Sequence, residues 1–335
     1  MKQLLLARLA SVLPILLAVS LLTFVLTRAT STDPVAQILG PGASQADRQE
    51  YAARIGLDKP LPAQFVSWVG AAFRGDLGHS LYTALPVTDT LLDGVSITLT
   101  LAFWGMAFAL LAGIPVGIWG AVRHGSWADR LVSILVSLGL ALPSFWLGLV
   151  LQVLFYKHLN LLPVGGRLGI LDVAPPRVTG MYVVDALVSG DFDLFRSSVL
   201  HLILPAVTLA AGSVAVVTRM MRASILETMG ADYIRTARAK GLTEPSLLRR
   251  HVLRNAFIPT LTVLGLQVGY LLAGNFLVES VFNWPGIGLY AIDAISNLDY
   301  AAIMGVTLVV SVVYIVVNLI VDILYVLLDP RISYS

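Results

Sequence analysis

The polar side chains that could do chemistry in this sequence lie in two places. The first is residues 218–259, a stretch rich in arginine with few carboxylates. The second is a long apolar stretch that contains Gln267, Asn275 and Glu279. Polar groups inside an apolar helix usually face protein or a water-filled path. A long basic segment between two apolar stretches suits docking on a partner.

No catalytic or metal-binding pattern occurs in the sequence. The chain has no cysteine, which excludes disulfides and thiolate sites. Its five histidines are scattered along the chain at His79, His124, His158, His201 and His251. The GxxxxGK[ST] phosphate loop and the HExxH motif are both absent. We therefore predict no catalytic residue, no metal site and no cofactor in this chain, and no binding of ATP by the chain itself.

The composition indicates an integral membrane protein. Of the 335 residues, 57% are hydrophobic and only 13% are charged, and the mean hydropathy is +0.83. A soluble protein carries about a quarter charged residues, so this chain could not supply a sufficiently polar surface.

Six apolar stretches are long enough for membrane helices, which need about 20 residues each. They span residues 9–27, 94–122, 131–156, 199–218, 257–281 and 301–328. The first could be a signal peptide, but its apolar run is long and no A-x-A cleavage site follows, so we expect it to be retained. These stretches predict an all-α membrane protein with six transmembrane helices, plus a short external helix near residues 45–56.

Basic residues orient the helices. Lys and Arg gather before the first span, after the second, after the fourth and after the sixth, and six spans place all these segments on one side. Cytoplasmic loops are enriched in Lys and Arg, so we expect both termini in the cytoplasm. The predicted organisation is a first helix with an external region (1–93), a five-helix domain (94–329) with a cytoplasmic loop at 219–256, and a tail (330–335).

The cytoplasmic loop has its own helical pattern. Residues 220–240 favour a helix, which Gly241 is expected to end because glycine accepts the left-handed conformation of a C-cap. Thr243 can cap a second helix with Pro245 in its first turn. The plain alternative is that the basic residues only fix the topology, but this explains neither the length of the loop nor its break.

The loop resembles a known signature. Residues 232–242, DYIRTARAKGL, are similar to the cytoplasmic signature of permease subunits in binding-protein-dependent ABC importers. His251, Asn255 and Pro259 fit the peptide-importer version. Many members have Glu-Ala-Ala before the glycine, where this chain has Arg235, Thr236 and Ala237, a departure typical of the peptide branch.

The resemblance extends along nearly the whole chain, to the B-type permeases of the dipeptide/oligopeptide (peptide/nickel) family. The matching segments are 56–61 (GLDKPL), 75–80 (GDLGHS), 162–167 (LPVGGR), 201–206 (HLILPA) and 279–288 (ESVFNWPGIG). One departure is STDP at 31–34, where the family often has PGDP. The resemblance implies a type I ABC importer permease fold in a bacterial inner membrane.

The resemblance also implies roles and partners. The residues expected to couple to an ATPase are Asp232, Tyr233, Arg235, Thr236, Ala237, Ala239, Lys240 and Gly241. The expected partners are a second homologous permease, two ATPase subunits that bind ATP and Mg²⁺, an external or periplasmic substrate-binding protein and a peptide substrate, with no nucleic acid. Gln267, Asn275 and Glu279 are candidates for lining the pathway.

Other functions stay open at this point. The same permease branch also imports nickel, glutathione and other small solutes. A secondary transporter is a less favoured alternative, because its charges would more often lie within the spans and its plan would often show an internal repeat. A membrane enzyme or a passive scaffold are further alternatives, with no catalytic pattern to favour the first.

Overall fold

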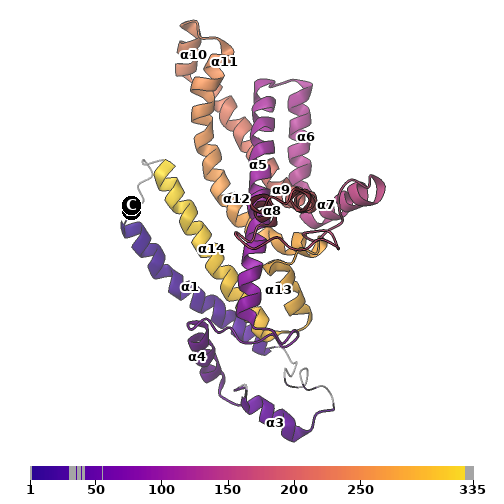
Figure 1. Cartoon of the computed structure of the whole chain (residues 1–335). Coiled ribbons are helices and arrows are strands. Elements are labelled where there is room, and N and C mark those ends of the chain that lie inside the picture. Colours follow the sequence, from indigo (N-terminus) through magenta and orange to yellow (C-terminus); the bar gives the residue numbers. More distant parts are fainter. Residues whose placement is uncertain (1, 30–34, 36–38, 40–41, 55, 329–335) are drawn as a thin grey trace. The chain divides into compact units, whose positions relative to one another are not determined.

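The computed structural model describes residues 2–29, 35, 39, 42–54 and 56–328, and the regular secondary structure in this part is helical. These residues hold one isolated β-bridge, between His79 and Pro86, and no strand. The helices (Figure 1) are α1 (Lys2–Ala29), α3 (Gln45–Arg54), α4 (Leu61–Ala72), α5 (Val87–Val122), α6 (Trp127–Ala141), α7 (Ser144–Leu151), α8 (Tyr182–Ser189), α9 (Phe192–Met229), α10 (Asp232–Ala239), α11 (Glu244–Leu247), α12 (Leu253–Val281), α13 (Ile287–Ser296) and α14 (Tyr300–Leu328), with π-helical turns η1 (Gln152–His158) and η2 (Leu248–Val252). The all-α prediction is confirmed. The expected motif at 31–34 and the tail at 330–335 lie outside the described residues.

Five helical segments are long and apolar enough to cross a membrane. They are Val12–Ala29, Val87–Val122, Phe192–Met229, Glu244–Leu272 and Tyr300–Val321. A sixth crossing results if the bent pair Trp127–Ala141 and Ser144–His158 counts as one span. The predicted spans are therefore present, and several helices continue beyond the apolar stretches. The predicted external helix at 45–56 corresponds to α3, whereas α8 and α13 were not predicted.

The predicted third span, residues 131–156, is not one continuous helix. α6 ends at Ala141 and α7 begins at Ser144, and the two helical segments are bent by 108°. The cause is Pro143, because the residue before a proline is sterically disfavoured in the helical region. Leu142 accordingly has an extended backbone, with φ −81° and ψ 129°.

The chain divides into two compact units. The first contains Met1–Ser96 and Pro285–Val316, and the second contains Ile97–Trp284 and Val317–Ser335. In the first unit, buried Asp299 precedes α14 and accepts hydrogen bonds from the Ala302 amide (3.2 Å) and the Ser80 hydroxyl (2.5 Å). This carboxylate therefore fixes the start of α14 to the loop that carries Ser80.

In the second unit, α9 is the central helix, and α6, α7, α8 and α12 pack against it. Close approach depends on small residues. A Cβ at Gly117 of α5 would lie 2.8 Å from the Thr218 carbonyl oxygen of α9, and a Cβ at Gly139 of α6 would lie 3.0 Å from the Ala215 Cβ. Small residues let membrane helices pack closely, so these glycines fix where α5 and α6 meet α9.

Candidate functional site

The first half of the predicted cytoplasmic loop, residues 219–256, is a direct extension of α9. The predicted single helix over 220–240 is wrong: α9 runs to Met229, Gly230 ends it, and α10 begins at Asp232. Ala231 between them is extended, with φ −71° and ψ 147°. Figure 1 shows α10 and α11 projecting beyond the ends of α5 and α6. The break lets α10 take a direction of its own at the tip of the unit.

One buried side chain holds α10 in place. Ile234 is fully buried in a cluster with Met221, Ile225, Leu247 and Val252, which come from α9, α11 and η2. An isolated helix of eight residues is unstable in water. The burial of Ile234 in this cluster therefore supplies the order that α10 cannot supply itself.

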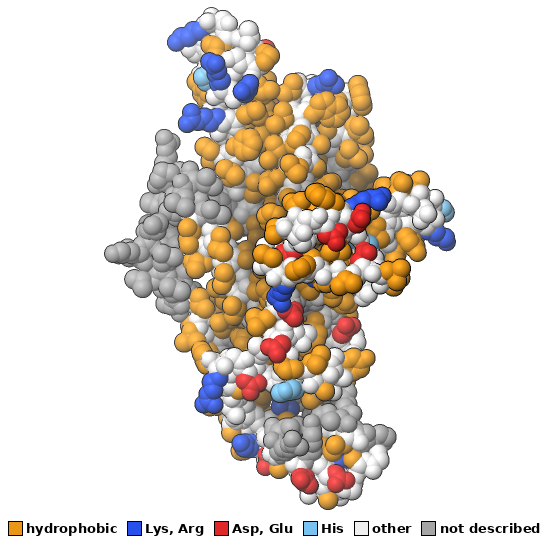
Figure 2. All heavy atoms as spheres, in the orientation of Figure 1, with side chains coloured by type: hydrophobic (Ala, Val, Ile, Leu, Met, Phe, Trp, Pro, Cys, Tyr) orange, Lys and Arg blue, Asp and Glu red, His pale blue; other side chains and the backbone are white. Residues whose placement is uncertain are grey.

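The predicted coupling residues lie around this anchor. All are exposed except Ala237, which is partly buried against the same cluster; the exposed ones are Asp232, Tyr233, Arg235, Thr236, Ala239, Lys240 and Gly241. Figure 2 shows basic side chains gathered at this tip of the second unit. Asp232 and Arg235 form an ion pair at 3.5 Å, with side chains 96% and 73% exposed. α10 thus presents a polar, mostly open surface on a fixed base.

The end of α10 is built as the sequence predicts. Gly241 has φ +86°, and its amide and that of Leu242 donate to the Arg238 and Ala237 carbonyls at 3.0 and 3.3 Å. This pair of bonds is a Schellman cap, which needs a left-handed residue. Across the turn, Arg238 Nε donates to Glu244 Oε1 at 2.6 Å, and this hydrogen bond raises the pKa of Arg238. α11 then starts after Thr243, whose side chain makes no capping hydrogen bond.

A second contact ties α10 to the start of α12. The Asn255 amide Nδ2 donates to the Tyr233 hydroxyl at 3.1 Å and to the His251 carbonyl at 2.8 Å. Asn255 and His251 are two of the residues that carried the resemblance to peptide importers. In this structure the two residues have a structural role, because their hydrogen bonds link α10 to α12.

A buried carboxylate anchors the turn between α5 and α6, and sequence reasoning missed it. Asp129, near the start of α6, accepts from Arg222 Nε at 2.6 Å and from Arg222 Nη2 at 3.0 Å. It also accepts from the Gly125 amide at 3.0 Å and contacts His124 Nδ1 at 2.9 Å. Its side chain is 8% exposed. A two-pronged arginine–carboxylate contact is strong and directional, so it links the turn before α6 to the stretch of α9 that leads into α10.

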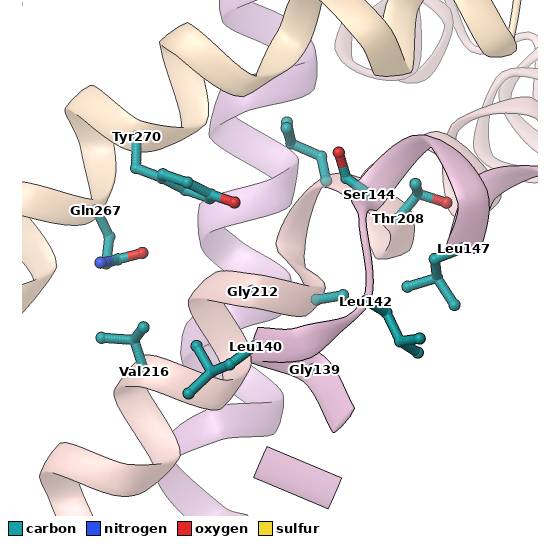
Figure 3. Close-up of a pocket in the computed structure, with 12 residues that line it drawn as sticks. Gly139, Leu140, Leu142, Ser144, Leu147, Thr208, Gly212, Val216, Gln267 and Tyr270 are labelled. Atoms are coloured by element: carbon teal, nitrogen blue, oxygen red, sulfur yellow. The ribbon is translucent and has the colours of Figure 1, made fainter. Parts of the chain in front are cut away.

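A cavity of about 260 Å³ lies where the break between α6 and α7 meets α9 and α12. Figure 3 shows Gln267 and Tyr270 on α12 near Gly212 and Val216 of α9, with Leu142 and Ser144 of the break nearby. The Ser213 hydroxyl donates to Gln267 Oε1 at 2.9 Å. The cavity is therefore lined by polar groups together with the glycines Gly139 and Gly212.

Thr208 adds a polar group to the same cavity. Its side chain is fully buried, and its hydroxyl has no hydrogen-bond partner among the described residues. Buried polar groups are normally hydrogen-bonded. Tyr270, Ser144 and Thr208 were not predicted, because only the fold brings α7, α9 and α12 together around one space.

The three residues predicted to line the pathway lie in different surroundings from one another. Gln267 lines the cavity. Glu279, near the other end of α12, is fully buried and accepts a hydrogen bond of 2.6 Å from the Thr98 hydroxyl of α5. It is not among the residues lining this cavity. Asn275 is on α12, but its side chain lies outside the described part of the structure.

Among known proteins, two family descriptions together match nearly the whole chain. The family described as "Binding-protein-dependent transport system inner membrane component" matches residues 113–334. Its companion, "Binding-prot-dependent transport system membrane comp, N-term", matches residues 1–102.

Several curated proteins are similar along their whole length. The "Probable D,D-dipeptide transport system permease protein DdpB" of Escherichia coli strain K12 is 45% identical over 315 residues, covering 94% of this chain and 93% of that protein. The dipeptide transport system permease protein DppB of the same strain is 42% identical over 339 residues, covering both completely. The di/tripeptide transport system permease protein DppB of Pseudomonas aeruginosa strain UCBPP-PA14 is 44% identical, with 98% of each covered.

A solved structure shares the fold. The inward-facing methionine ABC transporter MetNI matches with a TM-score of 0.51 and 18% identity, over 73% of this chain and 96% of that chain. This likeness concerns the fold alone and agrees with the expected permease architecture. The chain belongs to the family of binding-protein-dependent transport system inner membrane components, as a multi-pass permease subunit of an ABC importer.

Proposed function

We propose that this chain forms half of the translocation pathway of an ATP-driven importer for dipeptides or short oligopeptides. The substrate class is taken from the names of the relatives that match along their full length, which are dipeptide or di/tripeptide permeases. The structural observation that carries the coupling part is α10, a short helix held at Ile234 and exposed around it. A fixed, exposed helix at the tip of the membrane helices is a surface on which an ATPase subunit can dock.

The chain binds neither ATP nor Mg²⁺ in this proposal, and the energy enters through α10. Two ATPase subunits, a second permease and an external substrate-binding protein complete the importer. ATP binding draws the ATPases together and moves α10, and α9 and α12 carry that motion to the cavity because both pack into the cluster that holds Ile234. The binding protein then releases its peptide into an outward-open cavity, and hydrolysis restores the inward-open state.

The pathway in this proposal runs past Gln267 and Tyr270, with Asn275 and Glu279 further along α12. In this proposal the domains are 1–93, 94–329 and 330–335, and both termini lie in the cytoplasm. Residues Pro285–Val316 of the second domain pack with the first compact unit. The boundary near residue 93 is supported by the two family matches, which separate between residues 102 and 113.

The proposal is tested by isolating the tagged chain from its native membrane and measuring uptake. We expect a second permease and ATPase subunits to co-purify, and labelled dipeptide uptake to depend on ATP hydrolysis by those subunits. A strain with an ATPase subunit disabled for hydrolysis is the control. Uptake of nickel or glutathione in place of dipeptides would contradict the proposed substrate class. Isolation of the chain alone would contradict the coupling role.

A further inference from the structure

Three cavities follow one another along α1 and α4 in the first unit. The largest, about 540 Å³, is lined by apolar side chains of both helices, including Leu21, Val25 and Phe65. A second apolar cavity, about 210 Å³, lies between α1, α4 and α14. The third, about 220 Å³, shares Phe24 and Arg28 with the first and Trp68 with the second. It is therefore a polar compartment between two apolar ones.

The polar compartment is positively charged. Arg28 and Lys59 line it, and no described carboxylate forms an ion pair with either. The Arg28 guanidinium lies 5.4 Å from the centre of the Phe24 ring, which packs at 5.4 Å against Phe65 of α4. This stacking is a cation–π contact, and it fixes the cation at the junction with the largest apolar cavity.

Two more polar atoms of the same compartment lack partners. Gln64 Oε1 and Trp68 Nε1 are both buried and have no hydrogen-bond partner among the described residues. The opposite end of the Gln64 amide donates to the Leu57 and Lys59 carbonyls at 3.1 and 2.8 Å, which fixes its orientation. A buried donor or acceptor without a partner is costly. The Trp68 N–H can donate to an anion, whereas the Gln64 oxygen can only accept a hydrogen bond.

The surroundings restrict the occupant to a membrane component. Arg28 lies in the last turn of α1, at the end of the segment Val12–Ala29, which is long and apolar enough to cross a membrane. We expect the end of such a segment to lie at a membrane–water interface. α4 is apolar and carries exposed Val66, and exposed Phe73 follows its last residue; these side chains are 69% and 74% accessible. An apolar helix with a tryptophan is typical of the interface region. The two apolar cavities therefore face acyl chains, and the basic compartment lies at the depth of lipid headgroups.

We propose that these cavities bind one anionic glycerophospholipid. Its two acyl chains occupy the apolar cavities, and its phosphodiester lies between Arg28 and Lys59, with the Trp68 indole N–H as a further donor. The site would hold the external segment after α1 against the membrane. A simpler view, in which Arg28 only reaches the interface like many arginines at helix ends, does not explain the paired cavities or the second cation.

The test is native mass spectrometry of the complete importer after reconstitution in bilayers of phosphatidylcholine with a minor fraction of phosphatidylglycerol. We expect the wild-type complex to retain phosphatidylglycerol selectively. Each basic residue near the headgroups contributes about fivefold in lipid affinity, so Arg28→Gln with Lys59→Gln should weaken retention about thirty-fold. Arg28→Lys with Lys59→Arg keeps the charges and should retain the lipid.

Controls distinguish binding at this site from general attraction of anionic lipid to basic residues, and from other occupants of the cavities. Arg74→Gln removes an exposed arginine of the same unit that lines none of the three cavities, and it should leave retention unchanged. Free inorganic phosphate should not displace the lipid. Equal retention of both lipids, unchanged retention in the double glutamine variant, or disulfide cross-linking of Val66→Cys to a cysteine of the partner permease with no lipid present would each overturn the proposal.

Discussion

At the residue scale, Gly241 is the position where the backbone conformation alone determines the effect of a substitution. Its φ of +86° belongs to the left-handed region, and an added Cβ would meet no atom within 4 Å. Any effect of Gly241→Ala therefore comes from backbone strain and not from a clash. Such strain is about 1 kcal/mol for a residue with a Cβ.

Gly241→Ala is expected to lower peptide uptake by up to about fivefold, because about 1 kcal/mol changes the equilibrium constant between the ordered and the disordered loop by that factor. Uptake is measured in cells that contain equal amounts of the protein in the membrane. Gly190→Ala is the matched control, since Gly190 has φ +75°, an open Cβ position and a place at the end of α8. An equal loss in both variants would show that the strain acts on folding rather than on coupling.

The Asp129–Arg222 pair gives a second residue-scale prediction. Asp129→Asn leaves Arg222 without its carboxylate in a largely buried site. Breaking a buried ion pair costs several kcal/mol, and because Arg222 is 26% exposed we expect a loss nearer to about 2 kcal/mol. The purified complex should therefore unfold at a lower temperature.

Asp232→Asn is the control for that experiment. It removes a carboxylate from an exposed ion pair, and such pairs contribute little to stability, so its melting temperature should match the wild type while its uptake falls. The double variant Asp129→Asn with Arg222→Gln should recover part of the stability, because the two residues interact directly. Additive losses in the double variant would mean that the pair has no energetic coupling.

At the scale of the element, α10 depends on its neighbours. Its eight residues bury only Ile234 completely, so the helix is ordered by that contact and by the Tyr233–Asn255 hydrogen bond. Removing a buried Ile side chain costs about 2–5 kcal/mol. Ile234→Ala should therefore disorder α10 and abolish coupling, while Ile234→Leu, which conserves volume, should keep most activity.

The absence of cysteine from the sequence makes that prediction directly measurable. Ala239→Cys would introduce the only thiol of the chain, on the exposed part of α10. We expect it to cross-link to a cysteine placed on the ATPase subunit, and Ile234→Ala to reduce the cross-linked fraction strongly. Undiminished cross-linking in Ile234→Ala would contradict the anchoring role of Ile234.

At the scale of the whole molecule, charge placement predicts the orientation. Lys and Arg follow the second, fourth and sixth apolar stretches and precede the first, which places both termini in the cytoplasm. A C-terminal fusion to green fluorescent protein should be fluorescent, and a fusion to alkaline phosphatase at the same site should be inactive. A phosphatase fused after residue 80, in the external region, is the control and should be active. The reverse pattern would invert the orientation.

Hydropathy and local backbone preference were enough to predict the fold class and most of the membrane helices. Apolar stretches of about 20 residues determine membrane helices, and Gly241 determines a helix end because of its allowed backbone angles. The errors came from single residues inside strong patterns. Pro143 breaks the predicted third span, and Gly230 separates α10 from α9.

The sequence by itself determined that this chain is a helical membrane permease subunit and which short segment resembles a coupling helix. Only the tertiary structure decided which side chain anchors that helix, that Asp129 meets Arg222 across 93 positions of the chain, and that Gln267 and Tyr270 share a cavity with Thr208. The physical reason is that hydropathy and backbone preference are local properties. A buried ion pair or a cavity depends on which helix faces meet, and that is set by packing between residues far apart in the chain.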